Sequence, residues 1–251
     1  MITIIKRAFL NLLARIGLDY FGSSKSLSKI HKASGKKKLL ILGTGPSLSC
    51  INKDIFKHVD TLSVNGYAKL IKESQWPSPT YYMLQDLQVS EKIEPYLDSV
   101  NSKIISSSYL YLKNKKVRKY VNYVFNHYFM DHVFCDNYLP YTYKKTKDAA
   151  RYITDGYTVV YSAIELAEYL GYEEVYLLGV DASYSKELNN RNIVNINKID
   201  STYESAGDRI IFGIENFVNS KTKLKLYNCS IQGRLNFLQF SSEIDGVKIC
   251  L

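Results

Sequence analysis

Residues 38–48 constrain the fold most, because a short apolar strand runs directly into a glycine-rich turn there. The strand, Lys38–Leu42, carries leucine or isoleucine at every position after the lysine. This pattern is typical of a parallel strand covered by helices on both faces. The turn that follows consists of Gly43, Thr44, Gly45, Pro46 and Ser47. Because open α/β sheets bind ligands at the carboxyl ends of their strands, we expect this turn to lie at a ligand site.

The residue types of the turn suit a nucleotide or another anion. Gly43 and Gly45 can adopt positive φ and let the backbone approach a ligand, and Pro46 suits the first turn of a helix. Ser47 offers a hydroxyl to a phosphate or a sugar, and N–H groups at a helix start favour an anion. The sequence has neither the third glycine of the dinucleotide motif nor the Gly-Lys-Ser of a phosphate loop. The alternative is a tight strand-to-helix turn that binds nothing.

Further short apolar runs predict the rest of the sheet. Helical segments separate the strands that we expect at 61–64, 81–84, 103–106, 174–180 and 223–227. The fold class predicted is therefore α/β, with a Rossmann-like, mostly parallel sheet and helices on both faces. Polar residues follow three of the strands: Asn65, the pair Gln85 and Asp86, and Asp181. We expect them to line one crevice with the turn, where Asp181 holds ribose hydroxyls or a cation, or else caps a helix.

A second glycine turn precedes the helix with the clearest apolar stripe, residues 160–170. Thr154 or Asp155 can cap the start of this helix. The turn at Gly156 is predicted to direct backbone N–H groups toward an anion.

Composition along the chain divides it into three parts. Residues 1–20 form an amphipathic N-terminal helix, residues 21–37 a basic linker rich in Ser, Gly and Lys, and residues 38–251 a single Rossmann-like nucleotide-sugar-binding domain. Residues 109–147, dense in Tyr and Lys, are expected to form a helical lid insertion whose aromatic rings stack on sugars. The alternative is a peripheral helical layer without a role in ligand binding.

The net charge of +9 is concentrated at the N-terminus. Residues 1–38 hold nine basic residues against one acid, so they carry +8 and leave +1 for the rest of the chain. A domain that wraps nucleic acid would carry its charge on the globular part, so nucleic acid is not an expected partner. Instead we expect the basic partner surface in the N-terminal segment.

The N-terminal helix separates apolar from polar side chains. Residues 2–17 place Ile5, Phe9, Leu12, Leu13 and Ile16 on one face and Arg7, Asn11 and Arg15 on the other. The segment is too short and too charged to span a bilayer. We expect a cytoplasmic protein whose helix makes peripheral contact with the inner face of the plasma membrane. The alternative is docking on the protein's own domain, or on a second subunit in a homo-oligomer.

The cysteines and histidines indicate no metal site. Cys50, Cys135, Cys229 and Cys250 are widely scattered, so reduced thiols are expected rather than a disulfide framework. His127 and His132 are spaced five apart, which is poor spacing for two ligands on one helical face.

Five sequence segments together resemble a known family. They are GTGPSL at 43–48, Asn65, TDGYTV at 154–159, ELAEYLGYEEVYLLGVDASY at 165–184 and NCSIQGRLNF at 228–237. The chain resembles the motility-accessory-factor-like domain family and, more distantly, the small bacterial sialyltransferases that use CMP-sialic acid. The resemblance implies a glycosyltransferase that moves a sialic-acid-like sugar from a CMP-sugar donor onto a surface-glycan or lipid-linked acceptor in lipopolysaccharide or capsule synthesis. Carried over, the nucleotide-binding residues are Thr44, Gly45, Ser47, Asn65, Asp155, Gly156, Asp181 and Tyr184.

The chain also departs from the sialyltransferase pattern. Those enzymes usually have Asn where Thr44 stands and Ser where Asp155 stands, and they use a His downstream of the strand-end Asp as general base. Here no His follows His132, so either the donor differs or the base is another group: Asp86, Asp155, Asp208 or a His of the lid. We take Asp86, Asp155 and Asp181 as catalytic candidates, and Gly43, Pro46 and Gln85 as further binding residues.

Two other functions remain open. Archaeal pterin pyrophosphokinases share this fold, and in that reading Asp86, Asp155 and Asp181 would hold magnesium. The missing downstream His also fits a non-catalytic sugar-nucleotide-binding protein. No cofactor beyond the donor is firmly implied.

Overall fold

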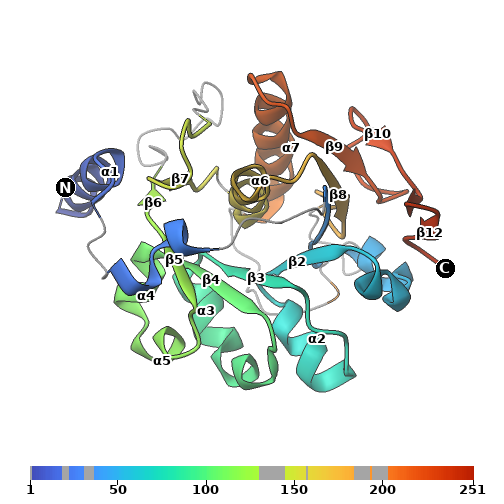
Figure 1. Cartoon of the computed structure of the whole chain (residues 1–251), viewed down its shortest axis with the longest axis horizontal. Coiled ribbons are helices and arrows are strands. Elements are labelled where there is room, and N and C mark those ends of the chain that lie inside the picture. Colours follow the sequence, from blue (N-terminus) through green and yellow to red (C-terminus); the bar gives the residue numbers. More distant parts are fainter. Residues whose placement is uncertain are drawn as a thin grey trace.

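In the computed structural model of the chain, the residues described are 2–18, 23–30, 37–129, 145–156, 158–183, 193 and 203–251. These residues form an eight-stranded parallel sheet in the order β10-β9-β8-β1-β2-β3-β4-β5 (Figure 1). Its strands are β1 (Lys38–Leu42), β2 (Asp60–Val64), β3 (Tyr81–Leu84), β4 (Lys103–Ser107), β5 (Tyr123–Phe125), β8 (Glu174–Leu178), β9 (Lys225–Asn228) and β10 (Gln239–Phe240). The predicted α/β class and parallel sheet are confirmed.

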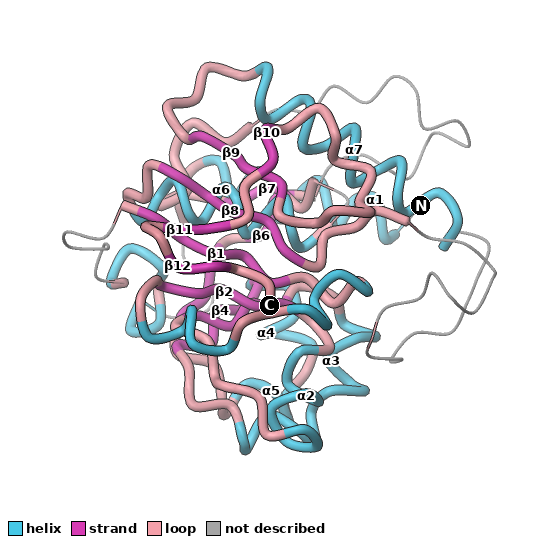
Figure 2. Tube along the Cα trace, turned by 90° about the vertical axis from the view of Figure 1, so that its right-hand side faces the viewer, coloured by secondary structure: helices cyan, strands magenta, loops and turns pink. Residues whose placement is uncertain are grey.

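Helices cover both faces of the sheet, as Figures 1 and 2 show. On β1, Leu39 and Ile41 pack into one core while Leu40 and Leu42 pack into the other. The first core is closed by α6 (Val159–Leu170) and α7 (Tyr203–Asn219). The second is closed by α2 (Tyr67–Ser74), α3 (Leu87–Ile93), α4 (Ser108–Lys113), α5 (Lys115–Arg118) and the 3₁₀ helices η3 (Pro46–Cys50), η4 (Lys53–Lys57) and η5 (Glu94–Ser99).

The topology places a switch point beside β1. The chain adds β2, β3, β4 and β5 on one side of β1, then returns with β8 on the other side. Ligands of open α/β sheets bind where the strand order reverses in this way. The carboxyl ends of β1 and β8 are therefore the expected ligand site.

Two smaller strand pairs lie outside the main sheet. The pair β6 (His127–Tyr128) and β7 (Ile153–Thr154) is parallel, and it leads into the second glycine turn. The antiparallel pair β11 (Glu243–Ile244) and β12 (Val247–Lys248) precedes the C-terminus.

The structure differs from the expected boundaries in two segments. The expected linker contains η1 (Ser23–Lys25) and η2 (Leu27–Lys29), and its Leu27 and Ile30 are buried in the first core. The first half of the expected lid, residues 109–128, lies in α4, α5, the edge strand β5, which pairs with β4, and β6. The apolar residues of η2 and of β5 were not recognised in the sequence, because Lys, Ser and Tyr residues surround them. Residues 130–144 lie outside the described part.

The expectation that all thiols are reduced is wrong for one pair. Cys50 at the end of η3 is disulfide-bonded to Cys250, 200 positions away in sequence. Backbone hydrogen bonds from Leu251 N to Cys50 O (3.0 Å) and from Asn52 N to Ile249 O (2.7 Å) hold the same two segments together. Spacing along the sequence could not reveal a pairing that depends on this packing.

The N-terminal helix is α1 (Ile2–Arg15), which contacts β6. In the parts of the chain described here, no helix combines the length and apolarity needed to cross a membrane.

Candidate functional site

Two turns at the carboxyl ends of β1 and β8 pack backbone against backbone. The N–H of Gly43 donates to Leu178 O and the N–H of Gly45 donates to Gly179 O, both at 2.8 Å. A Cβ atom on Gly43 would lie 2.2 Å from Gly179 O, and one on Gly45 would lie 2.4 Å from Asp181 Oδ2. Glycine is required at both positions, because the β1 and β8 turns approach too closely to leave room for a side chain. The expected positive φ is instead found at Gly179, at 73°, while Gly45 has a φ of −70°.

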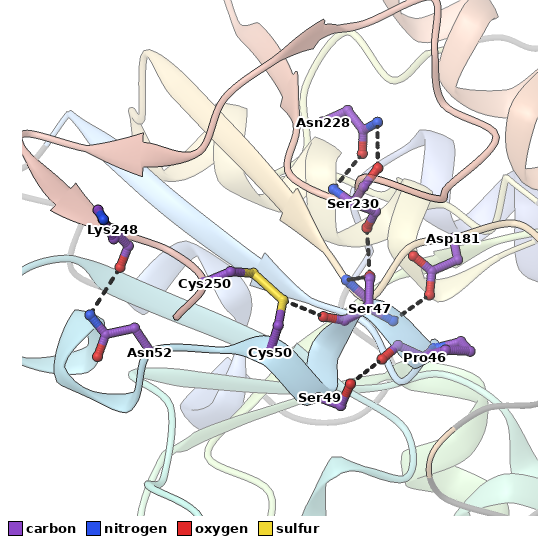
Figure 3. Close-up of a disulfide and its surroundings, with 11 residues drawn as sticks. Pro46, Ser47, Ser49, Cys50, Asn52, Asp181, Asn228, Ser230, Lys248 and Cys250 are labelled. Atoms are coloured by element: carbon purple, nitrogen blue, oxygen red, sulfur yellow. Dashed lines mark hydrogen bonds between the residues drawn. A yellow bond between two sulfur atoms is a disulfide. The ribbon is translucent and has the colours of Figure 1, made fainter.

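Ser47 is engaged by the protein itself, which differs from its expected role toward an anion. Its N–H donates to Asp181 Oδ2 at 2.9 Å (Figure 3). Its hydroxyl lies 2.7 Å from Ser230 Oγ and accepts from the Gly179 N–H at 3.0 Å. Pro46 starts η3 as expected. The carboxylate of Asp181 thus occupies the helix start that the sequence analysis assigned to a phosphate.

Two buried acceptor atoms flank this junction. Asp181 is 7% exposed, and its Oδ1 finds no hydrogen-bond partner among the described residues. The same holds for Oδ1 of Asn65, which follows β2 and has a φ of 51°. Ala182, next to Asp181, has a φ of 52°. Buried acceptors without donors are costly, and backbone strain of this kind gathers at functional sites. Both oxygens are suited to accept hydrogen bonds from a ligand.

The end of β3 is tied to the second glycine turn. Gln85 Nε2 donates to Asp155 O at 3.3 Å, and Ser162 Oγ donates to Gln85 Oε1 at 2.6 Å. Both ends of the Gln85 amide are therefore held by the protein. Thr158, not Thr154 or Asp155, caps α6 through its side-chain oxygen. Asp155 is therefore not the N-cap residue of α6.

Asp155 instead faces a histidine from the stretch expected to be a lid. His127 Nε2 lies 3.5 Å from Asp155 Oδ2, and the two side chains are 5% and 8% exposed. The imidazole ring is stacked on the Phe129 ring, with the ring centres 4.1 Å apart. It is also roughly parallel to the Phe125 ring, whose centre lies 6.3 Å away. Sequence reasoning named a histidine of this stretch as a candidate base without choosing one. The β6–β7 pairing, which propensity did not predict, brings His127 to Asp155.

Glu165 supports this turn from inside the protein, and sequence analysis did not single it out. Its two carboxylate oxygens accept from the N–H groups of Thr146 and Thr154, each at 2.8 Å. Burial raises the pKa of Glu165 to about 7, and the two N–H donors oppose the rise. The signal available was an acid between Ile164 and Leu166 in a mainly apolar helix.

Glu165 is expected to make folding depend on pH. Since its pKa in the folded state lies above the ordinary 4.5, its protonated form stabilises the fold, and that contribution is lost as pH rises from about 4.5 through about 7. The loss is on the order of a few kcal/mol. Urea denaturation of Glu165→Gln across this range should lack the decline. Glu173→Gln, an exposed position paired with Lys37, should keep it; an equal decline in Glu165→Gln would contradict the assignment.

The remaining candidates are not brought together. Asp86 is exposed and caps α3, its Oδ1 accepting from the Val89 N–H at 2.9 Å. Asp208 pairs with Arg234 at 2.7 Å on the surface. Thr44 is buried and its carbonyl accepts from Ile193 N at 2.8 Å. Tyr184 lies outside the described residues.

Two of the three acids that would hold magnesium in the pyrophosphokinase alternative, Asp86 and Asp181, do not fit a common ion. Asp86 follows β3 and Asp181 follows β8, and β1 and β2 lie between these strands. Three strand spacings separate their strand ends by roughly 14 Å. Within the described segments, no three His, Cys, Asp or Glu side chains gather as a metal site.

Comparisons with known proteins identify relatives of this fold. Residues 18–187 match the family described as 6-hydroxymethylpterin diphosphokinase MptE-like. The sialyltransferase CstII from Campylobacter jejuni, solved in complex with cytidine-5'-monophosphate, is 18% identical with a TM-score of 0.50; the similarity covers 84% of this chain and 90% of that one. The monofunctional α-2,3-sialyltransferase Cst-I from the same organism is 14% identical with a TM-score of 0.50, covering 85% and 83%. No curated protein matches significantly. The chain shares the sialyltransferase fold.

Proposed function

Because the chain belongs to the MptE-like family and has the sialyltransferase fold, we propose that it is a glycosyltransferase. It moves a sialic-acid-like sugar from a CMP-sugar donor onto a glycan or lipid-linked acceptor of a bacterial surface polysaccharide. The observation that carries this proposal is the pair of buried acceptors, Asp181 Oδ1 and Asn65 Oδ1, beside the glycine turn at the switch point.

A nucleoside supplies the donors that these two oxygens lack. Ribose carries hydroxyl groups and cytosine carries an amino group, and both kinds of donor satisfy a buried acceptor. The Asp181 carboxylate also holds the Ser47 N–H, so a nucleoside hydroxyl at its Oδ1 completes a group that is already fixed in place. Because a carboxylate repels phosphate, the nucleoside rather than the phosphate lies against Asp181.

Sugar transfer requires removal of a proton from the acceptor hydroxyl. In the proposed reaction the acceptor oxygen bonds to the anomeric carbon, the bond from that carbon to the phosphate oxygen breaks, and CMP leaves. Asp155 takes the proton, and His127 orients the Asp155 carboxylate through its Nε2–H. The chain thereby replaces the downstream histidine of the sialyltransferase pattern with an acid held by a histidine from β6.

The second candidate is diphosphate transfer from ATP, which the description of the matching family favours. That reaction needs divalent cations around the phosphates. The separation of roughly 14 Å between the strand ends that carry Asp86 and Asp181 speaks against the shared site that this candidate would use, and we derive no step through a metal.

A nucleotide panel tests the proposal. CMP at a hundredfold excess over its Kd should raise Tm by roughly 5–10 °C without magnesium, since it binds only the folded state. Asn65→Gly keeps the positive φ but removes Oδ1, so it should weaken CMP binding about tenfold. Asn101→Gly, at an exposed loop position, serves as control.

The other outcomes separate the alternatives. A shift seen with ATP and magnesium but not with CMP would support diphosphate transfer and overturn the proposal. CMP binding without release of CMP from any CMP-sugar would favour a non-catalytic binding protein.

A further inference from the structure

The helix α1 is attached to the domain by its polar face. Asn11 Nδ2 donates to Phe129 O and Asn11 Oδ1 accepts from the Phe129 N–H, both at 2.7 Å. The Arg7 guanidinium lies 5.1 Å from the centre of the Phe129 ring, and Arg15 donates to the Tyr128 hydroxyl. Ala14 is fully buried at this contact. Polar side chains thus make the attachment that apolar side chains make in an ordinary amphipathic helix.

The apolar face of α1 consequently points away from the protein. The exposed fractions are 61% for Ile5, 58% for Phe9, 56% for Leu12 and 63% for Ile16. Leu18, just beyond the helix, is 51% exposed. Isolated exposed apolar residues are normal, but a contiguous row on one helix face marks an interaction site.

The edge of the sheet next to α1 is strongly basic. Eleven Lys or Arg and no acid lie in the segments that form this edge. These segments are residues 2–18 (α1), 23–30 (η1 and η2) and 103–128 (the elements around β4 and β5). The whole chain carries +9, so all other residues together carry −2. The segments are in contact, since Lys25 donates to Val121 O and Ser26 bridges to Val124. Figure 1 shows α1, α4 and α5 along this side.

We propose that α1 lies flat on an anionic lipid bilayer, with its apolar face in the headgroup region and the basic edge against the lipid phosphates. An apolar helix face combined with local positive charge binds such surfaces. A second copy of the chain is a poorer occupant, because a two-fold contact through this face would bring two basic edges together. The inference concerns binding alone and does not depend on the proposed transferase activity.

The attachment also determines which part of the molecule meets the membrane. Phe129, which Asn11 clamps, stacks on His127, and His127 faces Asp155. The β6–β7 side of the strand-end site is therefore the side nearest the bilayer.

Vesicle flotation of the full chain tests the proposal. The wild type should float with vesicles of phosphatidylcholine and phosphatidylglycerol in equal parts, and more weakly with phosphatidylcholine alone or at high salt. The double variant Phe9→Ser, Leu12→Ser should lose at least about tenfold in partition, because two apolar side chains no longer enter the interface. The matched control is Ile231→Ser, Phe240→Ser, which changes two exposed apolar residues elsewhere, 80% and 49% exposed.

Circular dichroism verifies that both variants fold, which is expected because the replaced side chains are exposed. Equal flotation of the α1 variant and the wild type would overturn the proposal, as would a wild type that does not float. Dimerisation of the wild type that the α1 variant abolishes, without vesicle binding, would assign the face to a second copy.

Discussion

Asp155→Asn is expected to lower the rate of CMP release from CMP-sialic acid by about 10² to 10⁴-fold, the contribution of a general base. Asparagine keeps the size of the side chain but cannot take a proton. The stabilisation of the protein by CMP should change little, because the proposed nucleoside acceptors, Asn65 and Asp181, are intact. Single-turnover kinetics and the thermal shift, measured on the same preparation, separate the two effects.

Asp86→Asn is the matched control. Asp86 caps α3 through the Val89 N–H, and asparagine caps helices as well as aspartate does, so neither stability nor rate should change. Loss of rate in Asp86→Asn with full rate in Asp155→Asn would move the base to the start of α3. His127→Gln tests the positioning role: it should shift the pH–rate profile while Asp155 still acts.

The sheet was predictable because its strands carry local signals. Strands such as β1 and β8 are short, mainly apolar runs followed by a glycine, and the helix α6 has a clear apolar stripe ending at Gly171. The edge strand β5 was missed because three residues, Tyr123–Phe125, sit among Lys, Asn and His. Its pairing with β4 depends on tertiary packing, which outweighs local propensity in so short a strand.

The position of the glycine turn could be predicted from the sequence, but the contacts that its residues make could not. The glycine turn was placed correctly at a strand end. Ser47 looked available for a ligand because its partners Ser230 and Gly179 are more than 130 positions away in sequence. The proximity of His127 to Asp155 likewise follows from the pairing of β6 with β7. Side-chain roles depend on contacts between distant segments, which local pattern does not encode.

Gly45→Ala is expected to destabilise the fold by at least about 3 kcal/mol, because the added methyl group meets the Gly179 carbonyl oxygen and the Asp181 carboxylate, which the Ser47 N–H holds in place. Its Cβ would lie 2.7 Å from Gly179 O as well as 2.4 Å from Asp181 Oδ2. Relief would require the β1 and β8 turns to separate. That movement would break the Gly45–Gly179 hydrogen bond and weaken the cap that Asp181 makes on Ser47.

Urea denaturation compares this variant with Gly246→Ala. Gly246 has a φ of 79° and nothing within 4 Å of an added Cβ, so alanine there should cost only about 1–2 kcal/mol of left-handed strain. If Gly45→Ala cost no more than the control, the two turns could not be as closely packed as described. A large loss of stability would instead show that Gly45 is needed for the close packing of the β1 and β8 turns. The position of Asp181 Oδ1, the proposed nucleoside acceptor, would then depend on a contact that exists before any ligand binds.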